Sequence, residues 1–156
     1  MSKSVKRVQQ ALLDGGVTAE VIEMADGTRT AADAAAACGC AIDQIAKSII
    51  FRGQISGAAL LFITAGGNQV DATKASALAA EPLGKADADL IRAQTGFAIG
   101  GVAPLGHLNP IRTWIDPRLS DFIQVYAAGG TPRHVFPIAP ADLIRLSGAT
   151  PADFTA

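Results

Sequence analysis

The amino-acid sequence predicts a mixed α/β fold of the α+β kind, in which short helices flank a mixed β-sheet. Helical and strand-like segments alternate in the first half of the chain, whereas strand-like segments gather in the second half. Turns that contain glycine or proline separate these segments. The gathering of strands in the second half disfavours a doubly wound parallel sheet. No P-loop motif occurs, and residues 96–101 lack the spacing of a dinucleotide fingerprint, which argues against a nucleotide cofactor.

Length and composition predict a single domain over residues 1–156. A chain of this size buries about 70% of the surface that it exposes when unfolded, so its core needs no disulfide or metal for stability. With 13 basic and 14 acidic residues the net charge is -1. This balance argues against a polybasic protein, so we expect no duplex DNA partner, and any RNA contact must be local.

The sequence contains no signal for a membrane or for secretion. Its longest apolar runs, such as residues 58–65, are much shorter than the ~20 residues of a membrane-spanning helix, and no apolar core follows the charged N-terminus. Cys38 and Cys40 are one residue apart, which fits neither a C-x-x-C redox motif nor a four-ligand zinc site. We expect a cytoplasmic protein with no membrane partner, no metal and no cofactor.

The N-terminal region is predicted to contain a helix followed by a strand. Apolar residues recur at helical spacing over residues 4–14, and two glycines follow as a stop signal. Residues 17–24 are typical of a strand, and the dipeptide Asp26-Gly27 is typical of a turn.

The next segments are a short helix and two neighbouring strands. Thr30 is a suitable cap for a helix over residues 34–37. Residues 45–51 and 58–64 are apolar runs separated by a polar turn, which predicts adjacent strands.

Two further short helices follow. Asp71 can cap a helix through residue 80, and Asp87 can cap another through residue 94 that stops at Gly96.

The C-terminal half contains a glycine-rich loop and the remaining strands. Residues 97–106 include three glycines and a proline, which exclude an ordinary helix or a central strand. Residues 112–115, 121–127 and 135–138 are strand-like. A helix is predicted over residues 140–147, because proline begins it and glycine follows it, and Thr150-Pro151 is a further helix-start signal.

Lys47 is unusual because it lies in a segment that is otherwise apolar. A lysine is rarely buried without a partner or a function. It can occupy the solvent-exposed face of an alternating strand and extend its amine to water. The alternative is a cation at the edge of a pocket, where it would hold a carbonyl, ester or phosphate group.

The segment from Gly100 to His107 is the second unusual feature. Because Gly100 and Gly101 have no Cβ, their backbone amides can approach a ligand and bind developing negative charge, as an oxyanion hole does. The simpler explanation is a tight bend between strands. His107 and His134 both lie near predicted strand ends, where each is a base, a ligand anchor or an exposed structural residue.

Other catalytic arrangements have little support. No serine lies in a Gly-x-Ser-x-Gly elbow, the cysteines have no histidine nearby in sequence, and the histidines do not complete a metal site. The carboxylates most easily placed occupy expected helix caps.

Several separated motifs, in order, resemble the YbaK/EbsC family, which includes the editing insertion domain of bacterial prolyl-tRNA synthetase. The matching segments cover the chain from about Thr30 to its end, and they are Ile45-Ala46-Lys47-Ser48-Ile49-Ile50-Phe51, Ile63-Thr64-Ala65-Gly66, Val70-Asp71, Lys74, Thr95-Gly96, Gly100-Gly101-Val102-Ala103-Pro104-Leu105-Gly106-His107, Asp116, Leu119, Ala127-Ala128-Gly129-Gly130 and Asp142-Leu143.

The resemblance implies a free-standing aminoacyl-tRNA deacylase with a mixed, partly barrel-like sheet. Its substrate would be a mischarged tRNA, typically tRNA for proline carrying alanine, cysteine or another small residue, and prolyl-tRNA synthetase would be a second partner. The family lysine corresponds to Lys47 and the family Gly-x-x-x-Pro loop to residues 100–104. His134 resembles a histidine near the pocket of the synthetase domain. The resemblance leaves open whether the protein is a monomer or a homodimer.

A small set of groups can carry this chemistry because an aminoacyl ester is already activated. We expect Lys47 to hold the terminal adenosine or its phosphate, and Gly100 and Gly101 to hold the carbonyl and the attacking water. The 2′-hydroxyl of the substrate, as is proposed for the family, would assist. The predicted substrate-binding residues are Ile45, Ser48, Ile63, Val102, Pro104, His107 and His134. The main alternative is a module that binds aminoacyl-tRNA ends or a synthetase without catalysis.

Overall fold

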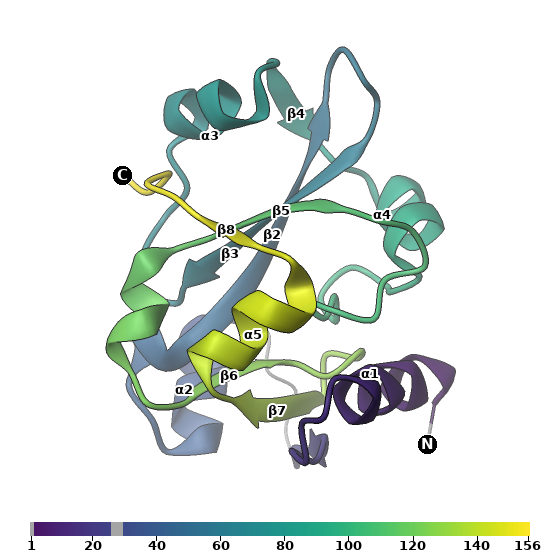
Figure 1. Ribbon diagram of the computed structural model, residues 1–156, viewed down its shortest axis with the longest axis vertical. Helices are drawn as coiled ribbons and strands as arrows, with labels where there is room; N and C mark the ends of the chain where they lie inside the picture. Colours follow the sequence, from purple (N-terminus) through teal and green to yellow (C-terminus); the bar gives the residue numbers. More distant parts are fainter. Residues whose placement is uncertain (1, 26–29) are drawn as a thin grey trace.

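The computed structural model describes residues 2–25 and 30–156 and contains, in these residues, one mixed sheet of eight strands (Figure 1). The strand order is β1-β7-β6-β2-β3-β5-β8, and β4 pairs with β2 beside this path. Short helices flank the sheet, as the sequence predicts. Within the described residues, no helix is long and apolar enough to cross a membrane.

The sheet is built around two long strands, β2 (Ile45–Gly53) and β3 (Ala59–Ala65). They pair antiparallel along their length, with Lys47 opposite Thr64. On its other edge β2 pairs in parallel with β6 (Val125–Ala128) and antiparallel with β4 (Leu83–Lys85). β3 continues the sheet in parallel to β5 (Arg112–Ile115).

The helices begin and end at residues with a clear capping function. α2 (Ala31–Cys38), α3 (Ala72–Ala79) and α4 (Ala88–Thr95) are capped by the side chains of Thr30, Asp71 and Asp87, which confirms the three predicted caps. α5 (Pro140–Ser147) ends at Gly148 in the left-handed conformation, as predicted.

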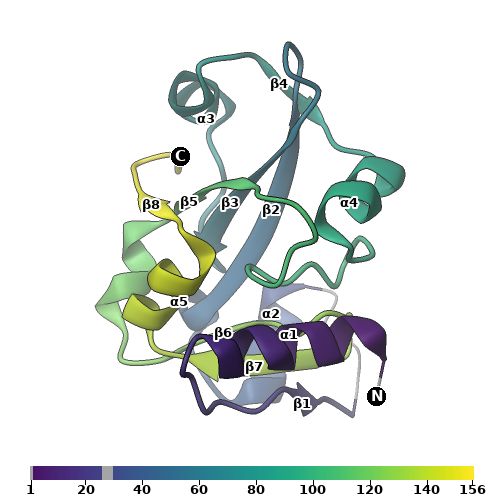
Figure 2. The same cartoon turned by 45° about the vertical axis from the view of Figure 1, so that its right-hand side comes forward.

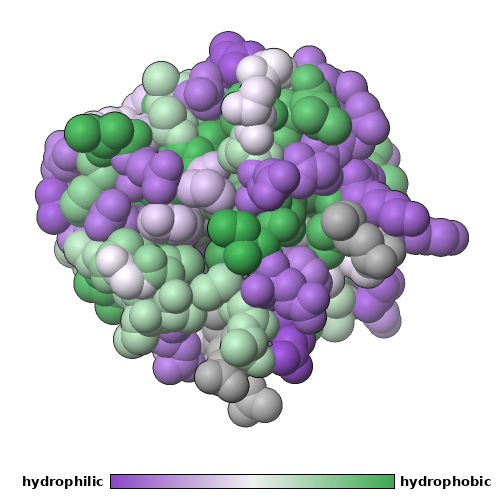
Figure 3. Space-filling view, turned by 90° about the horizontal axis from the view of Figure 1, so that it is seen from below, coloured by the Kyte–Doolittle hydropathy of each residue, from purple (hydrophilic) through white to green (hydrophobic). Residues whose placement is uncertain are grey.

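α1 (Lys3–Asp14) lies next to β6 and β7 (His134–Ile138) (Figure 2). Its buried face is formed by Val5, Val8 and Leu12, the residues that gave the predicted helical spacing. Figure 3 shows the surface at this end of the molecule, where a broad area of weakly hydrophobic residues and a strongly hydrophobic group near the centre lie among hydrophilic residues.

Three predicted elements are wrong in part. The strand expected over residues 17–24 is reduced to β1 (Ile22–Glu23), which pairs with β7 only at these two residues. The strand expected over residues 121–127 begins only at β6. Residue 121 is the last residue of a 3-10 helix (Pro117–Asp121) that Asp116 caps, and an irregular segment joins this helix to β6. The predicted helix start at Thr150-Pro151 is instead the edge strand β8, paired with β5.

β4 was not predicted, because Gly84 interrupts a segment of only three residues. The predicted turn at Asp26-Gly27 lies outside the described residues.

Alternate residues of β2 face two different hydrophobic cores. Ile50 packs against the main core, which contains Val102 and Phe97. Ile49 packs against a second core around Phe62 and Trp114, whose rings stack with centroids 4.9 Å apart. Because successive side chains of a strand point to opposite faces, residues 48 and 50 share the face of the main core, and residues 47 and 49 share the other.

Candidate functional site

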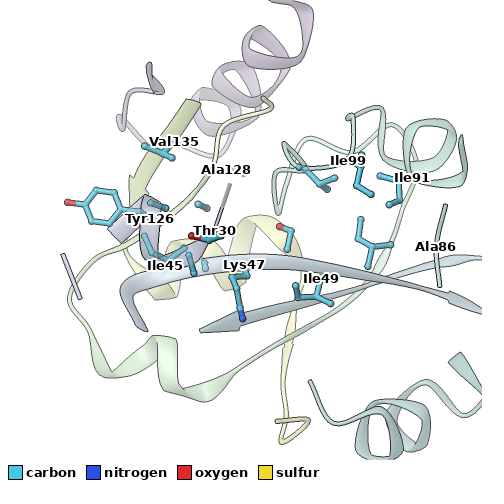
Figure 4. A pocket seen from close by; sticks show the side chains of 18 of the residues that line it. Thr30, Ile45, Lys47, Ile49, Ala86, Ile91, Ile99, Tyr126, Ala128 and Val135 are labelled. Carbon is cyan, nitrogen blue, oxygen red and sulfur yellow. The ribbon is translucent and has the colours of Figure 1, made fainter. Parts of the chain in front are cut away.

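A cavity of about 450 Å³ opens beside β2 (Figure 4). Its walls come from β2, α2, β6, β7 and the segments around α4. The lining residues are Thr30, Ala31, Ala34, Ile45, Ala46, Lys47, Ser48, Ile49, Ile50, Lys85, Ala86, Ile91, Ile99, Gly100, Val102, Tyr126, Ala127, Ala128 and Val135. The volume falls in the range of small-ligand sites, about 300–1,000 Å³.

The cavity exists because one edge of β2 loses its partners over a short stretch. β6 pairs with β2 only at Ile45 and Ala46, and β4 pairs only at residues 51–53. Between these two pairings, residues 47–50 have no strand partner on this edge in the described part of the chain. All four line the cavity.

The main chain of Ser48 faces this gap. Gly53 donates its N–H to Ala58 on the β3 side, and Gln54 donates its N–H to Pro82 on the β4 side. Backbone groups of a strand alternate between its two edges. Even-numbered residues of β2 therefore direct their N–H and C=O groups away from β3. For Ser48, this edge of the strand is the one that borders the cavity.

The side chain of Ser48 also faces the cavity and lacks a partner. Its Oγ is buried, and no hydrogen bond to it is formed within the described residues. Buried hydroxyl groups are nearly always hydrogen-bonded, because an unsatisfied one costs roughly 1–3 kcal/mol. A buried hydroxyl without a protein partner in the wall of a cavity is available for a hydrogen bond to a ligand or to water.

The glycine-rich loop forms the wall opposite. Gly100 has a φ of 90°, a conformation that requires glycine, and lines the cavity with Val102. The N–H groups of both residues have no acceptor among the described atoms. Free backbone N–H groups of this kind can bind an oxygen that carries negative charge.

For Gly101, the structure does not provide the free N–H group that the sequence predicted. Its N–H donates to Ala98 O at 3.1 Å, so this amide is already used. A Cβ at Gly101 would lie 2.6 Å from Cα of Thr131, so glycine is needed there for close packing of two loops. Gly101 does not line the cavity.

Lys47 lines the cavity, but its amine points to the other face of β2. Figure 4 shows its nitrogen on the side of the strand opposite to Ile91, Ile99 and Val135. Lys47 Nζ donates to Asn68 O at 2.6 Å. Burial lowers the pKa of the Lys47 amine, and the carboxylates of Asp116 and Asp43 partly oppose this shift. The predicted meeting of this amine with the glycine loop is therefore not present.

Four other predicted binding residues lie outside the cavity wall. Ile63 is fully buried in the main core, and Pro104 is buried in the loop. His107 Nε2 lies 2.7 Å from Ala103 O, and burial lowers the pKa of its imidazole. His134 Nδ1 shares a hydrogen bond of 2.5 Å with Thr131 Oγ1.

Of the predicted site residues, the structure thus brings together Ile45, Lys47, Ser48, Gly100 and Val102. Sequence reasoning missed the contributions of α2, β6 and Lys85. Nothing in the local sequence shows that β6, some 80 positions away from β2, pairs with it at Ile45. A signal for Lys85 was available in the sequence, since it is a cation two residues before the predicted helix cap Asp87.

The remaining candidate chemistry is not assembled in the described residues. No group of three or more His, Cys, Asp or Glu side chains there is close enough to hold a metal ion. The thiols of Cys38 and Cys40 are free, and burial raises the pKa of both.

Comparison with known proteins agrees with this fold. Residues 25–146 match the family described as "Aminoacyl-tRNA editing domain". A structure described as "Crystal structure of a putative trans-editing enzyme for prolyl tRNA synthetase" is 43% identical, with a TM-score of 0.92 over 100% of this chain and 99% of that chain. A structure from "Epitope backbone grafting by computational design for improved presentation of linear epitopes on scaffold proteins" is 42% identical, with a TM-score of 0.93 over 100% of this chain and 99% of that one.

A curated relative from Bacillus subtilis (strain 168), "Uncharacterized protein YwhH", is 27% identical over 92% of this chain and 91% of its own length. Together, the fold and the family match define an aminoacyl-tRNA deacylase, a hydrolase of the ester between amino acid and tRNA. The chain belongs to the aminoacyl-tRNA editing domain family, which confirms the resemblance seen in the sequence.

Proposed function

We propose that this protein removes a wrongly attached small amino acid, such as alanine or cysteine, from tRNA for proline, and that it does so in trans to prolyl-tRNA synthetase. The structure that is 43% identical is described as "a putative trans-editing enzyme for prolyl tRNA synthetase", which supports this substrate. The same assignment places the protein in the cytoplasm, where charged tRNA is used.

One observation carries the assignment of the reaction to this cavity. Within the described residues, Ser48 Oγ and the N–H groups of Gly100 and Val102 form no hydrogen bond, and all three residues line one cavity. The Ser48 hydroxyl is buried, and a buried hydroxyl without a partner is costly in a folded protein, which supports a site where a ligand completes its hydrogen bonds.

These groups suit ester hydrolysis by water. The carbonyl oxygen of the aminoacyl ester would lie against the N–H groups of Gly100 and Val102, which would stabilise the negative charge that develops as water attacks. The Ser48 hydroxyl would hold the water or the ribose 2′-hydroxyl in place. Attack forms the new C–O bond, and the proton passes to the departing 3′-oxygen as the ester bond breaks. The products are a free amino acid and an uncharged tRNA.

Lys47 would act on this reaction from the other face of β2. Its amine is a positive charge on the residue next to Ser48, and no carboxylate lines the cavity in the described residues. A unit charge within about 10 Å contributes on the order of 1–2 kcal/mol at an effective dielectric constant of about 20. The cation would therefore stabilise the oxyanion without a direct contact.

The shape of the cavity favours a compact amino acid by exclusion. Ile45 and Tyr126 form part of the wall next to α2. One methylene group changes binding by only about 1–3 kcal/mol, so steric exclusion is the stronger filter.

The test is a set of tRNAs charged with different amino acids, each scored for release of free amino acid by the wild-type protein. We expect catalytic turnover for tRNA for proline that carries alanine or another small residue, and none for correctly charged prolyl-tRNA. A binding module would instead protect the ester, so slower release in the presence of the protein would support that alternative and contradict hydrolysis.

A further inference from the structure

One end of the cavity differs from the rest in its chemistry. We call it the isoleucine end and define it by Ile50, Ile91, Ile99, Ala86 and Lys85. Figure 4 shows Ile91, Ile99 and Ala86 together, away from Tyr126 and Ile45 at the other end. Ile99 is 58% exposed, which leaves a large apolar side chain at the cavity rim.

Lys85 is the available cation of this cavity. The charged side chains that line it are Lys47 and Lys85, and no Asp or Glu is among the described lining residues. Lys47 already donates to Asn68 O on the opposite face. Lys85 is exposed, and its amine forms no hydrogen bond or ion pair with the described residues.

The nearest acidic residue along the chain does not remove this charge. Asp87, two residues after Lys85, accepts a hydrogen bond of 2.8 Å from Leu90 N and caps α4. The backbone of Lys85 belongs to β4, where Lys85 is paired with Phe51. The side chain therefore starts from a strand of the sheet rather than from a loop.

We propose that the isoleucine end is a nucleotide subsite, in which Lys85 binds the 5′-phosphate of the terminal nucleotide and the exposed face of Ile99 packs against its base. This inference rests on the proposed function, because it names how the tRNA end is held during ester hydrolysis. It assigns the phosphate to Lys85, whereas the sequence had suggested Lys47.

Two physical arguments support this subsite. A phosphate needs a cation that is free to approach it, and an ammonium group binds a phosphate as a point charge. A nucleobase presents an apolar face, and Ile99 offers apolar surface that otherwise remains in water. Both requirements are met at the same rim, within one cavity.

The experiment compares two small substrates, 3′-alanyl-adenosine and 3′-alanyl-adenosine 5′-phosphate, with the wild-type protein and with Lys85→Ala. We expect the wild type to prefer the phosphate-bearing ester about tenfold in kcat/KM, the size of one exposed charge-assisted contact. Lys85→Ala is expected to lose this preference, so that its kcat/KM values for the two esters become equal. Lys85→Arg is expected to keep most of the preference.

Lys74→Ala is the matched control. Lys74 pairs with Asp153 outside the cavity wall, so its removal changes net charge equally without touching the subsite. With full-length aminoacyl-tRNA, Lys85→Ala should also reduce the slope of log affinity against log salt by about 0.7, the value for one phosphate of a single strand.

The outcomes distinguish failure of the proposed function from failure of the nucleotide subsite. If the wild type releases amino acid from no substrate, the proposed function fails. If the wild type is active and Lys85→Ala keeps the full phosphate preference, the nucleotide subsite is wrong while the proposed function stands. A loss of preference in Lys74→Ala would also overturn the assignment to Lys85.

Discussion

The two faces of β2 carry neighbouring polar side chains in opposite situations. On the outer face, Lys47 donates to Asn68 O, and the opposite residue, Thr64, donates its hydroxyl to Phe62 O at 3.0 Å. On the cavity face, the buried hydroxyl of Ser48 has no partner in the described residues. The polar side chains named on the Lys47 face thus have hydrogen-bond partners within the described residues, whereas the Ser48 hydroxyl on the cavity face has none.

This difference supports the proposed location of the substrate. A polar group whose hydrogen bonds are satisfied inside the protein contributes to folding, whereas a buried group left unsatisfied costs stability and is available to a ligand. On this basis we propose that the ester binds on the Ser48 face, between β2 and the loop that contains Gly100. The following predictions test that assignment.

The largest effect is expected from filling the cavity face. Ser48→Leu places a larger apolar side chain where the ester would bind, and it removes the hydroxyl. We expect kcat/KM for aminoacyl-tRNA hydrolysis to fall by at least about 100-fold, as when an oxyanion-hole contact is lost. Circular dichroism should show that the fold is retained. Near-normal hydrolysis by this folded variant would move the site away from Ser48.

A smaller loss is expected from Lys47→Met, which keeps the apolar stem and removes the charge. Loss of about 1–2 kcal/mol of electrostatic stabilisation corresponds to roughly a 5- to 30-fold decrease in kcat. Because the charged form is the effective one and burial lowers the pKa of the amine, wild-type activity should fall as pH rises through that lowered pKa, below the ordinary lysine value of about 10.4.

The pH profile distinguishes this function from a purely structural one. After subtraction of spontaneous ester hydrolysis, Lys47→Met should lack the alkaline decrease. A variant that loses activity but keeps that decrease would show that another group titrates.

Removing only the hydroxyl groups of Ser48 and Thr64 should have different effects on the two faces of β2. Ser48→Ala is expected to lower hydrolysis by about 3- to 10-fold, the value of one hydrogen bond, and to leave the free energy of unfolding unchanged or higher. Thr64→Val is expected to lower stability by up to about 1 kcal/mol with unchanged hydrolysis. Urea denaturation and single-turnover kinetics measure both quantities. The reverse pattern would contradict the contrast between the faces.

The smallest effect is expected on the pH dependence of stability and concerns His107, which is not part of the cavity wall. Burial lowers the pKa of His107, so the folded state favours the neutral imidazole. Its contribution to stability is therefore present above the unfolded-state pKa of about 6.5 and is lost as pH falls through that value toward the folded-state pKa. His107→Gln should show a weaker decrease of the unfolding free energy between pH 7 and 5, at unchanged kcat near pH 7.5; an identical pH dependence would remove His107 from the explanation.

Much of the fold could be predicted because its signals are local. Caps such as Asp71 and Asp87 and stop signals such as Gly96 act within a few residues, and the structure places them as expected. The errors occur where long-range pairing overrides local preference. Thr150-Pro151 begins no helix because the backbone there is used by β5 as an edge partner.

The candidate site was predictable only in part, and its orientation was not predictable. The segment Ala46-Lys47-Ser48 identified a strand that lines the cavity, yet the face to which each side chain points depends on the register with β3 and on which edge remains unpaired. Likewise, Gly100 and Gly101 look equivalent in sequence, but only the packing of Thr131 shows that Gly101 serves the fold.

The most direct measurement follows backbone amide resonances while a non-hydrolysable analogue, 3′-alanylamino-3′-deoxyadenosine, is added. We expect the N–H signals of Ser48, Gly100 and Val102 to shift most, since these groups would gain hydrogen bonds to the aminoacyl moiety. The signals of Gly67 and Asn68, on the Lys47 side of the strand, should move little. Shifts confined to Gly67 and Asn68, with Gly100 and Val102 unchanged, would show that the substrate binds on the other face and would contradict the proposed site.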